Sequence, residues 1–285
     1  MTSPLERLRA RRLEVGAPLC LGIDPHPEHL PRDLPPTVAG MEAFARGLIE
    51  AAAPHAVAIK IQVAFFEALG AAGWAALERV RGDVPPDLLC ILDAKRGDID
   101  TTAERYAAGL LGHLDADAVT LSPYLGEDAI TPFLQYPDRL VYVLARTSNP
   151  SAARVQGLSV DGDALFLRVA RWAAETWTDG RVGLVVGATA PKELAQIRSS
   201  VPGPAFLVPG VGAQGGDLAA SVAACDGGWA PGVVSISRGI AAASLGADWR
   251  ESAERAAWGF RNRMQEAVLH SKAILAQRPI TEAQG

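Results

Sequence analysis

The sequence predicts an α/β protein folded as a single (β/α)8 TIM barrel, on three observations. Short apolar runs alternate with amphipathic segments, eight such runs occur, and no Gly-x-Gly-x-x-Gly motif follows the first of them. Strands that alternate with helices predict a parallel sheet. Eight repeats within about 250 residues match a closed barrel, and the missing glycine motif argues against a doubly wound open sheet.

The expected elements follow one another regularly along the chain. Each expected strand is a short apolar run, and the runs lie at 19–24, 57–62, 88–95, 118–122, 140–145, 182–186, 205–208 and 233–237. Segments rich in Ala and Leu with apolar spacing near 3.6 residues predict helices at 41–52, 65–80, 102–111, 162–175, 192–199, 216–224 and 248–275. No low-complexity linker interrupts them. Residues 1–285 are therefore expected to form one domain, with a loose tail over about 276–285.

Composition and charge exclude several classes of protein. The chain has 285 residues, of which 49% are hydrophobic and 21% charged, as expected for a soluble protein with a large core. Its net charge of −5 argues against a nucleic-acid-binding protein that relies on a basic surface. A short stretch with Arg7, Arg9, Arg11 and Arg12 is interpreted as the solvated face of a first helix.

Cysteine usage and the first residues predict a cytoplasmic location. Cys20, Cys90 and Cys225 are widely spaced and form no Cys-x-x-Cys motif, so neither a disulfide framework nor a zinc site is expected. The beginning of the chain is charged and has no apolar signal region, and no stretch reaches the ~20 apolar residues of a membrane span. The five histidines show no metal-binding spacing, so no metal is expected.

Polar residues gather where the expected strands end. In a barrel of this type the active site lies at the carboxyl ends of the strands. Those ends carry Asp24, Lys60, Gln62, Asp93, Lys95, Asp98, Ser122, Ser148, Thr189, the loop 210–214, Ser237, Arg238 and Gly239. The strand residues that precede them are almost all apolar. The distribution therefore predicts a functional site at this end.

The end of the third strand carries the most informative charges. Asp93 and Lys95 share one face of the strand, because side chains alternate, and Asp98 follows the turn that Gly97 allows. Charges at a buried strand end are costly unless they are paired or used. Lys60 lies within an apolar run, so we expect Asp93 on the adjacent strand to be its partner; the alternative is that Lys60 reaches the surface.

Two further strand ends suggest ligand binding. Asp24 precedes Pro25 and either forms a turn or accepts hydroxyl groups of a substrate. The glycine-rich loop 208–217 leads into an expected helix, and Arg238 follows the eighth strand. Backbone N–H groups of such a loop and a guanidinium together suit a phosphate group, which barrels commonly bind after strands seven and eight. The alternative is that both segments only form turns.

These residues resemble the orotidine 5′-phosphate decarboxylase family. The resemblance rests on Asp93-x-Lys95-x-x-Asp98-Ile99, on Lys60, on the loop 209–216 with Gln214, and on Arg238, in the same order at matching strand ends. The Asp-x-Lys-x-x-Asp element is shared with hexulose-phosphate synthases, but Lys60 and the Gln214 loop favour the decarboxylases. Long loops such as 144–151 are similar to those of the second, longer bacterial branch of that family.

The resemblance implies a catalytic role for four residues. Lys95 would deliver a proton to C6 of the pyrimidine as carbon dioxide leaves, and Asp93 would lie against the substrate carboxylate. Lys60 and Asp98 would complete an alternating array of lysines and aspartates. In the family the second aspartate comes from the neighbouring subunit, so a homodimer with shared active sites is expected.

The resemblance also implies which residues bind the substrate. Those that would come from the neighbouring subunit with Asp98 are Ile99 and Thr102. Asp24 would bind ribose hydroxyls, and Ser148 would bind the amide edge of the pyrimidine. The phosphate would be held by Gln214, Arg238 and the adjoining Gly239, although the order Ser237-Arg238-Gly239 departs from the Gly-Arg order frequent in the family.

The expected activity is the conversion of orotidine 5′-phosphate to UMP, the last step of de novo UMP synthesis, without metal or cofactor. A preorganised ammonium group both stabilises the developing carbanion and supplies the proton. The alternatives are a metal-assisted aldolase or decarboxylase of sugar phosphates, similar to hexulose-phosphate synthase, and a non-catalytic barrel that binds a phosphate ligand. The loop 146–161 is long enough for a mobile lid, but a long loop can also be ordered.

Overall fold

Eight parallel strands close into a barrel in the computed structural model, which describes residues 3–212 and 215–276. They are β1 (Leu19–Ile23), β2 (Ala58–Gln62), β3 (Leu89–Arg96), β4 (Ala118–Leu121), β5 (Leu140–Arg146), β8 (Val182–Val186), β9 (Phe206–Pro209) and β10 (Val233–Ile236). Their order around the barrel is β1-β10-β9-β8-β5-β4-β3-β2. The predicted barrel is confirmed, and each strand lies within one residue of its predicted bounds.

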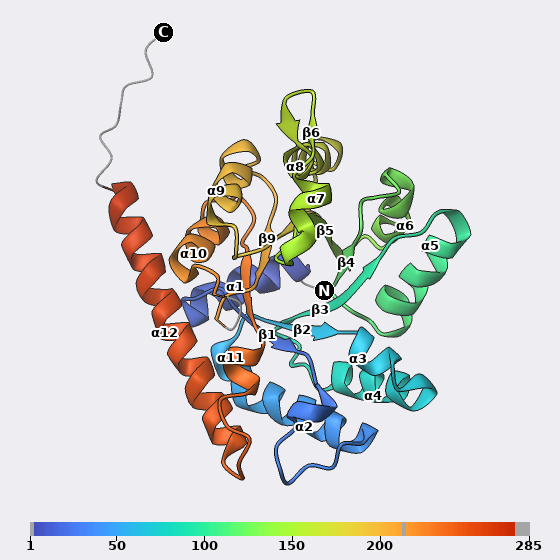
Figure 1. The fold of residues 1–285 in the computed structure, drawn as a ribbon, viewed down its shortest axis with the longest axis vertical. Helices are drawn as coiled ribbons and strands as arrows, with labels where there is room; N and C mark the ends of the chain where they lie inside the picture. The colour runs from blue at the N-terminus through green and yellow to red at the C-terminus, as the bar shows by residue number, and fades with distance from the viewer. Residues whose placement is uncertain (1–2, 213–214, 277–285) are drawn as a thin grey trace.

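Helices surround the barrel (Figure 1). The longer of those that follow a strand are α2 (Val38–Ala52), α4 (Gly70–Gly82), α5 (Asp100–Ala107), α8 (Leu165–Thr176), α9 (Pro191–Ser200), α10 (Leu218–Asp226) and α12 (Trp249–Ala276). Each corresponds to a predicted helix. Because they cover the outer face of the sheet, the strands are buried on both faces and consist of nearly continuous apolar runs.

The helix predicted over 41–52 begins three residues earlier, at Val38, and three other predicted helices also differ from the observed ones. The helix predicted over 65–80 is divided into α3 (Ala64–Glu67) and α4, because Gly70 adopts a left-handed conformation with φ of 64°. The helix predicted over 102–111 ends at Ala107 and continues as a π-helix, Ala108–His113. The helix predicted over 162–175 begins at Leu165, because Asp163–Ala164 (β7) pairs with Ser159–Val160 (β6) in an antiparallel hairpin.

Short helical segments were not predicted individually. They are α6 (Thr131–Leu134), α7 (Ala153–Gln156), α11 (Arg238–Ala241) and the 3-10 turns Pro27–His29, Ala53–His55, Glu127–Ala129 and Pro150–Ala152. Most lie in loops between strand and helix. The segment 146–161 thus contains ordered turns of helix. The tail predicted over 276–285 lies, except for Ala276, outside the described residues.

The first helix, α1 (Pro4–Val15), lies across the amino end of the barrel and is not the solvated helix that its arginines suggested. Arg11 is buried and donates hydrogen bonds to the carbonyl oxygens of Ala53 and Ala56, just before β2. Its neighbours on the helix contact other segments that enter strands: Arg7 contacts Pro86 and Asp117, and Arg12 contacts Asp226 and Gly232. The interpretation as a solvated face is therefore wrong for these three arginines, because backbone carbonyls and carboxylates close to the strand entries bind them.

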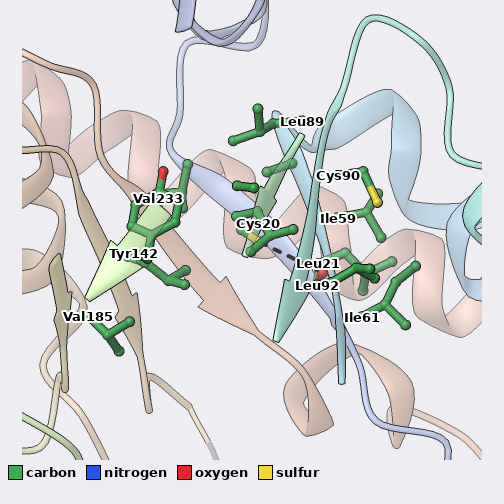
Figure 2. Close-up of a cluster of buried hydrophobic side chains, with 14 of the residues drawn as sticks. Cys20, Leu21, Ile59, Ile61, Leu89, Cys90, Leu92, Tyr142, Val185 and Val233 are labelled. Carbon is green, nitrogen blue, oxygen red and sulfur yellow. Dashed lines mark hydrogen bonds between the residues drawn. The ribbon is translucent and has the colours of Figure 1, made fainter. Parts of the chain in front are cut away.

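The core fills the barrel and the layer between sheet and helices. Figure 2 shows part of it, with Cys20, Leu21, Ile59 and Leu92 among the buried side chains. Residues paired between parallel strands point to the same face of the sheet. Thr120, which lines the cavity described below, is paired with Tyr142, so the Tyr142 ring points into the barrel. Among the helices of the described residues, none is both long and apolar enough to cross a membrane.

Candidate active site

The carboxyl ends of the strands surround a cavity of about 530 Å³. Six of the predicted site residues line it: Asp24, Lys60, Asp93, Lys95, Ser148 and Arg238. They come from or directly follow β1, β2, β3, β5 and β10, segments that are far apart in the sequence. The closed barrel brings these strand ends together, as the fold predicted.

Asp93 is the centre of a chain of ion pairs. Lys60 Nζ lies 2.9 Å from Asp93 Oδ2, and Lys95 Nζ lies 2.6 Å from Asp93 Oδ1. Lys60 Nζ also lies 3.8 Å from Asp24 Oδ1. Lys60 and Asp93 are buried, whereas the Lys95 side chain is 45% exposed and reaches into the cavity. The predicted pairing of Lys60 with Asp93 is thus observed, and Lys60 does not reach the surface.

Mutual attraction keeps the buried pair ionised. Burial by itself would lower the pKa of Lys60, but the carboxylates of Asp93 and Asp24 outweigh it and raise that pKa above its ordinary value of 10.5. Burial would likewise raise the pKa of Asp93, but Lys60 and Lys95 hold it below its ordinary value of 3.8. Both groups are therefore charged throughout the neutral range.

Two uncharged side chains complete the surroundings of Asp93. The Thr120 hydroxyl donates a hydrogen bond of 2.8 Å to Asp93 Oδ1, and the Gln62 amide donates one of 3.3 Å to Oδ2. Gln62 belongs to the polar strand ends noted in the sequence, but Thr120 was missed. Its signal was available: Thr120 is the one polar residue of the run 118–121.

Asp24 has an unused acceptor beside the charged chain. Its Oδ1 is buried and accepts no hydrogen bond from any described residue, although it lies 3.8 Å from Lys60 Nζ. A buried carboxylate oxygen without a donor is unfavourable. Asp24 lines the cavity, so a ligand with hydroxyl groups could supply the missing donor there.

The opposite side of the cavity has the features of an anion site. Arg238 is exposed and lines the cavity with Ser237 and Gly210. The loop after β9 turns through Gly210 and Gly212, with φ of 102° and 86°, conformations that favour glycine. Gly239 follows Arg238 in the first turn of α11. Gln214, predicted to bind phosphate, lies outside the described residues.

Ser148 lies in a loop that hydrogen bonds to the side chain of Gln156 hold in place. The preceding Thr147 accepts a hydrogen bond of 2.8 Å from the Gln156 amide group at its hydroxyl, and its own N–H donates one of 2.9 Å to Gln156 Oε1. Thr147, Asn149 and Gln156 line the cavity with Ser148. Sequence reasoning missed Gln156, because nothing in its local sequence indicates a contact nine residues away.

Asp98, Ile99 and Thr102 are not brought into this cavity. Asp98 forms no ion pair with any described residue and accepts a hydrogen bond from the Ile99 N–H at 2.9 Å. Ile99 is 44% exposed, and Thr102 is exposed on α5. Ser122 and Thr189 also lie outside the lining. Three of the predicted site residues thus lie outside the cavity, at the surface of the chain.

No group of three or more potential metal ligands of the His, Cys, Asp or Glu type occurs within residues 3–212 and 215–276. Cys20, Cys90 and Cys225 are buried free thiols. Burial raises the pKa of each thiol to about 12. These thiols are thus poor candidates for reactive nucleophiles.

The sequence of this chain is similar to those of known proteins. The model of the "Orotidine 5'-phosphate decarboxylase / HUMPS family" matches residues 17–255. A protein named orotidine 5′-phosphate decarboxylase from Roseiflexus castenholzii is 48% identical over 255 residues, which cover 88% of this chain and 93% of that protein. One of the same name from Herpetosiphon aurantiacus is 42% identical, covering 90% of this chain and 96% of its own length.

Solved structures show the same similarity. The structure of Leishmania donovani OMP decarboxylase has a TM-score of 0.78 and 39% identity, and the match covers 93% of this chain and 99% of that one. A putative orotidine-monophosphate decarboxylase from Toxoplasma gondii has a TM-score of 0.84 and 35% identity, covering 93% and 96% of the two chains.

Proposed function

Because the chain belongs to the orotidine 5′-phosphate decarboxylase / HUMPS family, we propose that it decarboxylates orotidine 5′-phosphate to UMP, the last step of de novo UMP synthesis. The relatives with that name match it over most of their length. The observation that carries the proposal is the ion-paired chain Lys60–Asp93–Lys95, which ends with an exposed ammonium group in the cavity.

The substrate binds with its phosphate at Arg238 and its ribose at Asp24. The guanidinium suits a phosphate, and the N–H groups of the glycine-rich loop, Gly239 and Gln214 complete that site. The unused Oδ1 of Asp24 accepts a ribose hydroxyl, which supplies its missing donor. Ser148 hydrogen-bonds the amide edge of the pyrimidine. These assignments place C6 of the base toward Lys95, between the two anchored ends.

Decarboxylation breaks the bond between C6 and the carboxylate and leaves the electron pair on C6. The ring offers this pair no position to delocalise into, so the site must stabilise it electrostatically. Lys95 Nζ donates its proton to C6 as carbon dioxide departs, and the product is UMP. The resulting neutral amine regains a proton from solvent, which reaches it because the side chain is 45% exposed.

Asp93 contributes in two ways. It holds the Lys95 ammonium at 2.6 Å and stays ionised because two lysines lower its pKa. Its negative charge also lies where the substrate carboxylate enters, so the repulsion is relieved when carbon dioxide leaves. Binding at the distant phosphate offsets that repulsion in the ground state.

A homodimer with shared active sites accounts for the remaining residues. Asp98, Ile99 and Thr102 lie outside the cavity of their own subunit, and apolar surface is exposed by Ile99, which directly precedes α5, and by Tyr106 on α5. Tyr124 and Leu125 expose more next to Glu127–Ala129, a segment that contacts α5. We infer that this surface meets a second copy of the chain and that Asp98 completes the partner's array of charges.

Two inactive variants test the shared site. Lys95→Ala and Asp98→Ala proteins are each expected to be inactive, and their mixture to regain up to about a quarter of the activity per site, because hybrid dimers contain one site without either substitution. Subunit exchange is verified separately by mass spectrometry of isotopically labelled chains. Verified exchange without recovered activity would contradict the assignment of Asp98.

An ultraviolet assay tests the reaction itself. Purified protein with orotidine 5′-phosphate and no added metal is expected to remove the orotate chromophore, and a chelator is expected to leave the rate unchanged. A rate that the chelator abolishes and magnesium restores would instead favour the metal-assisted sugar-phosphate enzyme. Binding of the nucleotide without turnover would favour the non-catalytic barrel. The cytoplasmic location stays a prediction.

A further inference from the structure

The register between strands β3 and β4 shifts where the catalytic charges lie. The regular pairing of β3 with β4 ends at Leu92 with Val119. It resumes at Arg96 with Leu121. Three residues of β3, Asp93, Ala94 and Lys95, therefore lie opposite one residue of β4, Thr120. Such a bulge bends a strand and redirects its side chains, and bulges are common next to active sites.

The bulge requires an unusual backbone at the proposed proton donor. Lys95 has a φ of 47°, in the left-handed region that residues with a side chain rarely adopt. Such a conformation persists only where the surroundings hold it. The contacts of the Lys95 backbone therefore decide where its ammonium group points.

Thr120 supplies the contact that the bulge needs. Its hydroxyl oxygen accepts a hydrogen bond of 3.0 Å from the Lys95 N–H, and its hydroxyl donates one of 2.8 Å to Asp93 Oδ1. Thr120 is 1% exposed, so water does not readily replace either bond. One buried hydroxyl thus connects the backbone of the proton donor with the carboxylate that pairs with its ammonium.

We propose that Thr120 is a positioning residue that holds the 93–95 bulge in the geometry required for proton transfer. This inference rests on the proposed function of Lys95 as the donor. Without the hydroxyl, the Lys95 N–H has no partner, and the backbone can relax toward an ordinary φ. Asp93 Oδ1 then keeps only its bond to the Lys95 ammonium, so the ammonium and the carboxylate move together away from C6.

The test compares Thr120→Val, which removes the hydroxyl at nearly constant volume, with Thr120→Ser, which keeps it. We expect the valine variant to lose kcat by about tenfold to a hundredfold, the range for a lost hydrogen bond to a charged group, while KM changes by less than about threefold. The serine variant is expected to recover most of kcat. Thr120→Ala replaces the valine variant if that protein does not fold.

A matched control removes a buried hydroxyl elsewhere. Ser221 is fully buried in α10 and donates its hydrogen bond to the Asp217 carbonyl oxygen of the same helix. Ser221→Ala is expected to keep the wild-type kcat. A valine variant with wild-type kcat, or a serine variant as slow as the valine variant, would overturn the proposal, since the hydroxyl would then have no role.

A second measurement does not depend on activity. Hydrogen exchange in a peptide spanning 92–98 reports protection of the Lys95 N–H, which is expected to be lost in Thr120→Val and retained in Thr120→Ser. If the wild-type protein does not turn over orotidine 5′-phosphate, the proposed function fails, but this exchange still tests the bulge. Unchanged protection in the valine variant would refute the hydrogen bond on which the inference depends.

Discussion

Lys60 and Arg198 are both buried cations, at opposite ends of the barrel, and their pKa values move in opposite directions. They are 4% and 9% exposed. Lys60 faces the carboxylates of Asp93 and Asp24, and these raise its pKa despite burial. Arg198 lies near the entry to β9, and its acceptors among the described residues are all backbone carbonyls, so burial lowers its pKa to about 10. Burial lowers the pKa of both cations, and the net shift is upward only at Lys60, where full negative charges rather than carbonyl dipoles face the buried group.

The two ends also differ in how completely their polar groups are satisfied. All three guanidinium nitrogens of Arg198 donate to carbonyl oxygens, and its Cζ lies 3.4 Å from the centre of the Phe206 ring. At the carboxyl end of the barrel, Asp24 Oδ1 has no donor among the described residues, and the Lys95 side chain is 45% exposed. Buried charge alone therefore does not indicate a functional site. Unused hydrogen-bonding capacity that faces a cavity does.

The largest effect on activity is expected for Lys95, at the carboxyl end of the barrel, and this substitution should change stability little. Lys95→Ala is expected to lower kcat by at least about 10³-fold, because it removes the general acid. The free energy of unfolding should change by less than about 1 kcal/mol, since the side chain is half-exposed. Steady-state assays and urea titrations measure the two quantities. Lys192→Ala, which removes an exposed lysine of α9, is the control. Substantial activity in the Lys95 variant would contradict its role as proton donor.

Asp93→Asn is expected to lower both kcat and the free energy of unfolding. The variant leaves Lys60 buried without its main counter-charge, so the free energy of unfolding should fall by about 3 kcal/mol or more. The rate should fall at least about a hundredfold, because the Lys95 ammonium loses the carboxylate that holds it. Urea titrations and the ultraviolet assay measure these losses. A stable variant would mean that Lys60 is not held by Asp93.

The difference in the free energy of unfolding between the wild type and Asp93→Asn should depend on pH. The stabilisation by Asp93 is complete above its ordinary pKa of 3.8 and is lost as the pH falls toward its lowered folded value. The stabilisation by Lys60 is complete below its ordinary pKa of 10.5 and is lost as the pH rises toward its raised pKa in the folded protein. The wild-type advantage over Asp93→Asn should therefore be constant from about pH 5 to 9 and decrease below about pH 4. A decrease near neutral pH would show that Asp93 is not ionised as described.

The smallest effect on activity is expected at the amino end. Arg198→Met removes the donors of several backbone carbonyls, and the free energy of unfolding should fall by about 2 kcal/mol. The kcat should stay at the wild-type value, since none of the site residues that the structure describes forms a hydrogen bond or ion pair with Arg198. Thermal unfolding and the ultraviolet assay together check this expectation. A large loss of kcat in a folded Arg198 variant would remove the distinction between the two ends.

Local patterns account for how well the barrel could be predicted. Strand bounds were accurate because an apolar run covered by helices on one side and a core on the other leaves few alternatives. The helix predicted over 65–80 was wrong in one respect, since the left-handed turn at Gly70 depends on backbone geometry that composition does not specify. Arg7, Arg11 and Arg12 of α1 were misinterpreted because they donate to carbonyls and carboxylates more than forty residues away in the sequence.

For the site, the sequence by itself determined which charges the strand ends carry: Asp24, Lys60, Asp93, Lys95 and Arg238 are recognisable because charged residues next to buried strands are costly and therefore conspicuous. Only the tertiary structure decided how they are used. The barrel brings Lys60 to 2.9 Å from Asp93, the bulge gives Thr120 two hydrogen bonds that no linear pattern indicates, and Asp98 lies outside the cavity. Side-chain alternation is a local property of the chain, whereas register, bulges and closure depend on contacts between strands distant in sequence.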